Sequence, residues 1–255
     1  NKPYGDQVAY MGCRTRVMAN VVGPEVTDGR GNLSFTTINL PRLAIKAHGD
    51  ITEFYQKLKE LITLTCEQLF HRYQVQCKLK VKDMPFLMGQ GLYIDSDKLS
   101  HNDCIESIIK NGTLSVGFIG LAETLVALTG KHHGQSATSQ TLGEEIVAFM
   151  RSEIDKAADK YQLNYTLLAT PAEGLAGRFV KIDRREYGLI AGVTDKKYYK
   201  NSFHIPVSYP ISLYEKVNLE GVYHKYTNSE HFIYVELSSP PLNNLDAIED
   251  IIRYM

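Results

Sequence analysis

The stretch Leu114-Ser115-Val116-Gly117-Phe118-Ile119-Gly120-Leu121-Ala122 decides the fold class of this chain. It is an uncharged run with the length of a buried strand, and a helical pattern begins directly after it at Leu121. Strands that are apolar on both faces and separated by helices are typical of a mainly parallel sheet with helices outside. The sequence therefore predicts an α/β fold, although this pattern does not separate an open sheet from a barrel.

Apolar runs of strand length and helical patterns alternate along the rest of the chain. Further strands are predicted at 33–39, 165–169 and 232–237. Helices are predicted from Asp50, over 143–161, from Pro171, over 210–226 and over 245–255. We expect one compact unit over residues 1–255.

Composition excludes several classes of partner. The chain has 255 residues, of which 44% are hydrophobic, and its 28 Lys and Arg against 29 Asp and Glu give a net charge of −1. Such a balance provides no global field for a nucleic-acid backbone or an acidic membrane. The longest apolar stretch, 114–130, carries too many polar residues and glycines for a bilayer span. We expect no membrane and no direct nucleic-acid partner.

Four cysteines at 13, 66, 77 and 104 form no CxxC pair, which favours a reducing cytoplasm over a zinc site or a disulfide framework. Cys66, Cys77 and Cys104 follow apolar helical stripes and are predicted to fill the core. Cys13 instead lies between Gly12 and Arg14 in a polar segment, where positive charge favours a thiolate. It is the candidate catalytic residue, and the alternative is a loop cysteine without a role.

Candidate binding residues follow the predicted strands. Ligands of parallel α/β folds gather at the carboxyl ends of strands, where Asn39 and Thr170 lie. Thr170-Pro171-Ala172-Glu173 predicts a helix start capped by Thr170. The first-turn amides, at Ala172 and Gly174, are candidates for holding a substrate phosphate, although the Glu173 carboxylate competes for them.

Two further positions are candidate substrate contacts. Asn32 offers an amide for ribose hydroxyls, or it closes the turn at 29–31. Asn39 offers the same group, or it ends a strand. His204 is a candidate for a substrate or a reductant, although a lone histidine beside apolar residues is more often a hydrogen-bonded core residue.

Five runs in the sequence resemble the anaerobic, class III ribonucleotide reductases. They are Met11-Gly12-Cys13-Arg14 and the segments 29–42, 117–123, 169–178 and 198–207. Their order and spacing agree with the family over essentially the whole chain. Asn32 is the position most similar to the family's substrate asparagine.

The resemblance implies a piece of a longer enzyme. It implies the C-terminal half of a ten-stranded α/β barrel of the glycyl-radical type, with residues 1–32 as an inserted loop region carrying Cys13 and 33–255 as alternating strands and helices. The effector-binding, zinc-binding and glycyl-radical segments are expected to lie outside this chain, which then holds no cofactor of its own.

The resemblance also implies partners and a reaction. The expected partners are a ribonucleoside triphosphate, a radical-SAM activating enzyme, the remaining segments of the polypeptide and a second copy in a homodimer. A thiyl radical at Cys13 would remove the ribose 3′ hydrogen and labilise the 2′ hydroxyl, giving a deoxyribonucleotide. A dry pocket that shields the radical is the physical requirement.

Three alternatives stay open. Another glycyl-radical enzyme would also carry a loop cysteine but would not bind nucleotide phosphates. A cysteine hydrolase would need Cys13 and His204 in hydrogen-bond reach. Finally, the isolated chain is expected to be inactive, as a scaffold that only binds nucleotide.

Overall fold

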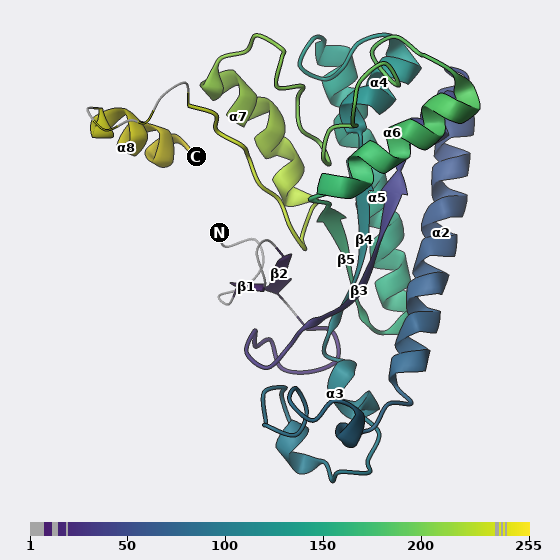
Figure 1. The fold of residues 1–255 in the computed structure, drawn as a ribbon, viewed down its shortest axis with the longest axis vertical. Coiled ribbons are helices and arrows are strands. Elements are labelled where there is room, and N and C mark those ends of the chain that lie inside the picture. The colour runs from purple at the N-terminus through teal and green to yellow at the C-terminus, as the bar shows by residue number, and fades with distance from the viewer. Residues whose placement is uncertain (1–7, 12–14, 19, 238–239, 241, 243) are drawn as a thin grey trace.

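The computed structural model describes all residues except 1–7, 12–14, 19, 238–239, 241 and 243 (Figure 1). Its centre is a parallel sheet of β3 (Asn32–Asn39), β4 (Thr113–Ile119) and β5 (Asn164–Ala169), in the order β3-β4-β5. Every residue of β4 and β5 is buried, which explains why their sequences lack the alternation of a half-exposed strand. The predicted α/β class with a parallel sheet is confirmed.

Helices cover one face of the sheet (Figure 1). After β3 the chain forms α1 (Leu40–Lys46) and the long α2 (Ile51–Gln76), and after β4 it forms α4 (Leu121–Thr129) and α5 (Ala137–Tyr161). α2 and α5 pack on each other and lie along the sheet. Asp50 caps α2 as predicted, because its side chain accepts the backbone N–H of Glu53 at 3.0 Å.

The abrupt step from β4 into α4 depends on Gly120. Its φ of 78° lies in the left-handed region, and a Cβ there would approach Pro41 to 2.3 Å. A side chain at this position would therefore be both strained and crowded, so α4 begins directly at the end of β4.

A smaller unit of loops lies at the amino end of the sheet, between α2 and β4. It contains the 3-10 turns η1 (Val81–Asp83) and η2 (Ser96–Lys98) and the short α3 (Glu106–Ile109). Cys104 is exposed there, so its predicted place in the core is wrong, whereas Cys66 on α2 is buried as expected. Cys104 departs from the helical stripe because it comes before α3 and bridges to Lys80.

Near the N-terminus, β1 (Val8–Met11) and β2 (Thr15–Met18) form an antiparallel hairpin. Cys13 falls between them and lies outside the described residues. The predicted cysteine loop is thus not described by the structure.

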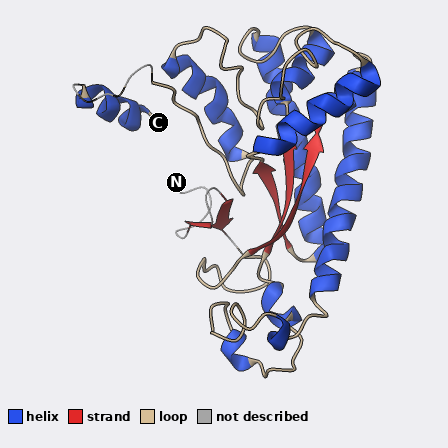
Figure 2. Cartoon of the chain, in the orientation of Figure 1, coloured by secondary structure: helices blue, strands red, loops and turns tan. Residues whose placement is uncertain are grey.

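The C-terminal part comprises α6 (Glu173–Tyr187), α7 (Leu213–Gly221), η3 (Val222–Lys225) and α8 (Leu245–Tyr254). The strand predicted at 232–237 is wrong, because this segment runs as irregular chain (Figure 2). Its neighbour Glu230 makes a single parallel bridge to Leu168 of β5, and the chain then leaves the sheet. None of the helices in the described part of the chain is long and apolar enough to cross a membrane.

Candidate functional site

A cavity of about 270 Å³ opens beyond the carboxyl ends of β4 and β5. One wall is the start of α6, with Ala172 and Glu173. The second is the segment 198–207, which includes Lys200 and His204. The third is formed by Lys216, Tyr234 and Glu236. Parallel α/β folds place ligands at this edge of the sheet.

The segment 200–202 is fixed to the end of β4 through the backbone. Asn201 forms an antiparallel bridge with Ile119, and the N–H groups of Gly120 and Leu121 donate to the carbonyls of Lys200 and Ser202 at 2.8 and 3.0 Å. These bonds satisfy amides at the start of α4 that have no partner within the helix. One wall of the cavity is thereby tied to the central strand.

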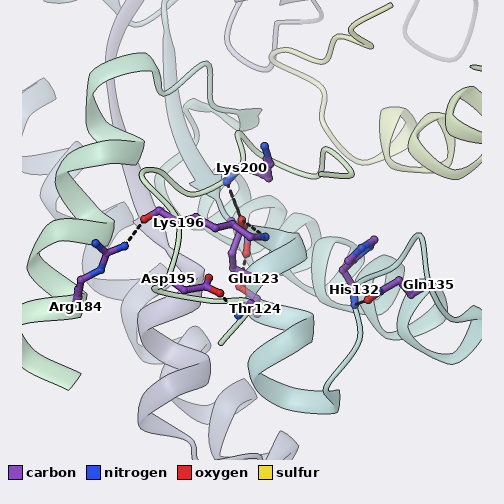
Figure 3. A network of polar contacts seen from close by, with 10 residues as sticks. Glu123, Thr124, His132, Gln135, Arg184, Asp195, Lys196 and Lys200 are labelled. Carbon is purple, nitrogen blue, oxygen red and sulfur yellow. Dashed lines mark hydrogen bonds and ion pairs between the residues drawn. The ribbon is translucent and has the colours of Figure 1, made fainter. Parts of the chain in front are cut away.

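Glu123 adds a buried carboxylate to this junction (Figure 3). Its oxygens accept the backbone N–H of Lys200 at 3.2 and 3.3 Å, and the Lys196 ammonium lies 3.7 Å away. Burial raises the pKa of Glu123, while Lys196 and the Lys200 N–H act in the opposite direction. Glu123 therefore holds the cavity wall from inside the fold.

A second buried carboxylate, Glu220 of α7, holds the other end of the segment. It accepts the backbone N–H of Ile205 at 2.9 Å and faces His204 Nδ1 at 3.2 Å and Lys216 Nζ at 3.5 Å. Burial alone would raise the pKa of Glu220, but His204, Lys216 and the Ile205 N–H together hold it below the ordinary value. Glu220 is thus ionised and paired within the cavity wall.

Asp183 of α6 forms a third buried acid site beside the cavity. It accepts from Asn39 Nδ2 at 2.8 Å, Arg42 Nε at 2.6 Å and the Tyr199 hydroxyl at 2.8 Å. Burial and the neighbouring Asp183 charge raise the pKa of Tyr199, which lines the cavity as a neutral donor. This network joins α1, α6 and the cavity wall.

The structure brings part of the predicted site together. Ala172 and His204 line the cavity, and Gly174 lies in the first turn of α6, where a Cβ would meet nothing within 4 Å. Thr170 is buried beneath, with its hydroxyl 3.1 Å from that of Thr37.

The predicted cap at Thr170 is wrong, because the N-cap residue of α6 is Ala172. The helix begins at Glu173, and the Thr170 side chain is engaged with β3 instead. The first turn of α6 consequently begins two residues later than predicted, and it contains Gly174.

The two predicted asparagines lie at opposite ends of β3, which at about 3.3 Å per residue separates them by roughly 23 Å. Asn32 accepts from the Thr113 hydroxyl at the amino end. Asn39 caps α1 and donates to Asp183 at the carboxyl end, so its amide is held within the protein. Of the two, Asn39 is the nearer to the network around the cavity.

Sequence reasoning missed Glu220, Lys216 and Asp183. Glu220 and Lys216 are four residues apart on one helix, a spacing that indicates a shared face. Nothing local to Asp183 indicates its partners Asn39 and Arg42, which come from more than 140 residues earlier in the chain.

The model of the family described as anaerobic ribonucleoside-triphosphate reductase matches residues 1–255. The chain belongs to this family. It is 36% identical over 249 residues to the anaerobic ribonucleoside-triphosphate reductase of Salmonella typhimurium and 34% identical to that of Escherichia coli. Both matches cover 96% of the chain but 35% of the relative, so the chain spans about a third of the length of these reductases.

Solved structures support the fold of this reductase segment. The anaerobic ribonucleotide reductase of Thermotoga maritima with citrate in the active site matches with a TM-score of 0.66 and 16% identity, covering 91% of the chain and 40% of that structure. The same reductase in complex with dATP and CTP gives a TM-score of 0.67 and 17% identity, covering 93% of the chain and 37% of that structure. The parallel α/β arrangement is therefore that of the reductases.

The structural zinc expected for the reductases has no ligand set in the described part of the chain. Among those residues no group of three or more His, Cys, Asp or Glu side chains is arranged to hold a metal ion.

Proposed function

We propose that this chain is the second part of the catalytic barrel of an anaerobic ribonucleoside-triphosphate reductase. The match of the family model to all 255 residues is the observation that carries the proposal. In the longer protein, β3, β4 and β5 would continue into a ten-stranded α/β barrel. Residues 1–32 would form the cysteine loop region and residues 33–255 the alternating strands and helices.

The reaction would convert ribonucleoside triphosphates into 2′-deoxyribonucleoside triphosphates for DNA synthesis. Hydrogen replaces the 2′ hydroxyl, which leaves as water, and two electrons and two protons come from a reductant of the formate or dithiol class. Cys13, as a thiyl radical, would remove the ribose 3′ hydrogen and later return it. A cysteine can serve in this way only in a shielded pocket.

The start of α6 would hold the substrate phosphate. Ala172 lines the cavity, the space beside Gly174 is open, and the positive end of the helix dipole favours an anion. The Glu173 N–H already donates to the Pro171 carbonyl at 3.2 Å, so the amides of the following residues are the candidates. Glu173 and Glu236 also line the cavity and oppose an anion there. Lys200 and Lys216 on the other walls favour one, and the Lys216 charge is shared with Glu220 at 3.5 Å.

His204 would be a second contact to the substrate from the opposite wall. Asn32 and Asn39 are weaker proposals for ribose contacts, since both amides already have partners in the protein. Asn39 would act through Asp183 and Tyr199 on the shape of the cavity.

The proposed partners follow from the family. The Thermotoga maritima relative has been solved with dATP in its specificity site, which favours nucleotide effectors for the longer protein. We also propose a radical-SAM activating enzyme and a homodimer. The free thiols of Cys66, Cys77 and Cys104 fit a reducing compartment such as the cytoplasm.

The test is product analysis under strict anaerobiosis. The longer protein that contains this chain, once activated, should convert CTP into dCTP, whereas residues 1–255 alone should form none. If the activated longer protein reduces none of the four ribonucleoside triphosphates, the proposed function is contradicted. Deoxynucleotide formation by residues 1–255 alone would contradict the proposal that this segment is only part of the machinery.

A further inference from the structure

His204 is held through one of its two ring nitrogens, Nδ1. Nδ1 lies 3.2 Å from Glu220 Oε2, and Glu220 is fully buried. An ionised carboxylate only accepts hydrogen bonds, so Nδ1 is the donor of this pair. Nε2 is then the ring nitrogen available to a ligand, and the imidazole lines the cavity opposite the start of α6.

The packing around the ring restricts it to this orientation. The Tyr234 ring lies 4.8 Å from the imidazole in an edge-on arrangement, and the Phe203 ring lies at 5.1 Å. Glu220 also accepts the N–H of Ile205, the next residue, so one carboxylate fixes both the ring and its backbone. Such second contacts are how proteins set the tautomer and direction of a histidine.

Titratable groups from several elements lie near the ring. Nearby His133 is buried and donates to the Phe203 carbonyl at 2.7 Å, and burial lowers the pKa of His133 to about 4, so its ring is neutral. The titratable and charged groups that face His204 from the packed elements are Glu220 and Lys216 of α7, Glu173 of α6, His133, Lys200, Tyr234 and Glu236. Glu220 is the acid in direct contact with the ring.

We propose that Glu220 is a positioning residue of the substrate site, which holds His204 as an imidazolium with Nε2–H directed at a phosphate oxygen of the nucleotide. The identity of the ligand rests on the proposed function. The contact between Glu220 and His204 is independent of it. An imidazolium donates from both nitrogens, so it can bind Glu220 and a phosphate together. Nucleotide affinity should consequently fall as the pH rises and His204 loses its proton.

The first measurement follows His204 itself in the full-length enzyme. Diethyl pyrocarbonate acylates only an unprotonated imidazole nitrogen, so the rate of His204 modification against pH, read by peptide mass spectrometry, gives the midpoint of its titration. Removing the adjacent negative charge in Glu220→Gln should move this midpoint to lower pH. Glu220→Asp should restore it in part, and Glu215→Gln, an exposed charge change on the same helix, should leave it unchanged.

The second measurement follows the reaction. Glu220→Gln should raise KM for CTP roughly tenfold, the usual worth of a charged hydrogen bond, and leave kcat within about twofold. In the native enzyme, 1/KM for CTP should fall as the pH rises through the midpoint of the His204 titration. Saturating CTP should slow the modification of His204. Glu215→Gln should keep the native values.

The outcomes separate the two claims. An unchanged His204 titration in a folded Glu220→Gln enzyme, or no modification of His204 at any pH, overturns the positioning role. A shifted titration with native KM and no protection by CTP overturns the phosphate contact. If the native enzyme reduces no ribonucleotide, only the proposed function is contradicted, because the modification of His204 against pH can still be measured.

Discussion

The Glu123 carboxylate accepts the backbone N–H of Lys200 at 3.2 Å, joining the first turn of α4 to the cavity wall across 77 residues of chain. Glu220 makes the equivalent bond to Ile205 at 2.9 Å. Two buried acids from different helices thus hold the two ends of one segment. The shape of the candidate site therefore depends on two buried carboxylates that do not line the cavity.

Replacing Glu123 by Gln should change how stability depends on pH. Burial raises the pKa of Glu123 above its value in the unfolded chain, so the native state favours the protonated form. Relative to Glu123→Gln, the native protein should be most stable below the unfolded pKa of about 4 and lose stability as the pH rises through the raised value. Urea unfolding of both proteins between pH 4 and pH 8 measures this difference.

The exposed Glu60 of α2 provides the control, since Glu60→Gln should give a curve parallel to that of the native protein over the same range. If the unfolding free energy of Glu123→Gln also runs parallel to that of the native protein against pH, the burial of Glu123 does not disfavour its ionised form.

Asp183→Asn should be strongly destabilising. Asp183 is fully buried and pairs with Arg42, so losing its charge leaves the partly buried guanidinium with only the more distant Glu186 carboxylate, at 3.8 Å. Breaking a buried pair typically costs about 3 kcal/mol, whereas the Arg151–Asp155 pair on α5, whose carboxylate is half exposed, is worth at most about 1 kcal/mol. Chemical denaturation of Asp183→Asn and Asp155→Asn compares them, and equal losses would contradict the structural role of Asp183.

Elements were predictable where burial dominates. Residues 114–119 and 165–169 are apolar on both faces, and their strands follow from that alone. The segment 232–237 has a similar composition but is not a strand, because pairing with β5 stops at Glu230. Strand pairing is a long-range property that local composition does not report.

The start of α6 shows how a tertiary contact overrides a local pattern. The Thr-Pro-x-Glu sequence predicts a cap at Thr170, but the side chain turns to Thr37 instead. Gly117 of β4 leaves the space, since a Cβ there would lie 2.0 Å from the Thr170 hydroxyl. The candidate cavity was predictable from strand ends, whereas its buried acids are paired through contacts that only the fold creates.

Gly174→Glu should weaken nucleotide binding. An acidic side chain near the first turn of α6 favours the helix dipole and has room to fit, so the fold should keep or gain stability. The same charge repels a phosphate, and an affinity loss of roughly tenfold is expected for one like charge in a partly buried site. Calorimetric titration of the full-length enzyme with CTP measures this, with Gly174→Ala as the uncharged control.

If Gly174→Glu and Gly174→Ala bind CTP alike in folded enzymes, the phosphate does not lie at this helix. A loss in both variants would instead indicate that the site is too close to tolerate any side chain.

The most direct test of the central claim is ribonucleotide reduction by full-length Cys13→Ser enzyme under anaerobic conditions. A hydroxyl cannot replace the thiol as the hydrogen-abstracting radical, so deoxynucleotide formation should disappear while the fold and the glycyl radical signal in electron paramagnetic resonance stay intact. Cys104→Ser, which changes an exposed thiol at the amino end of the sheet, should keep native turnover. Retained turnover in Cys13→Ser would contradict the account of this chain as the cysteine-bearing part of a radical reductase.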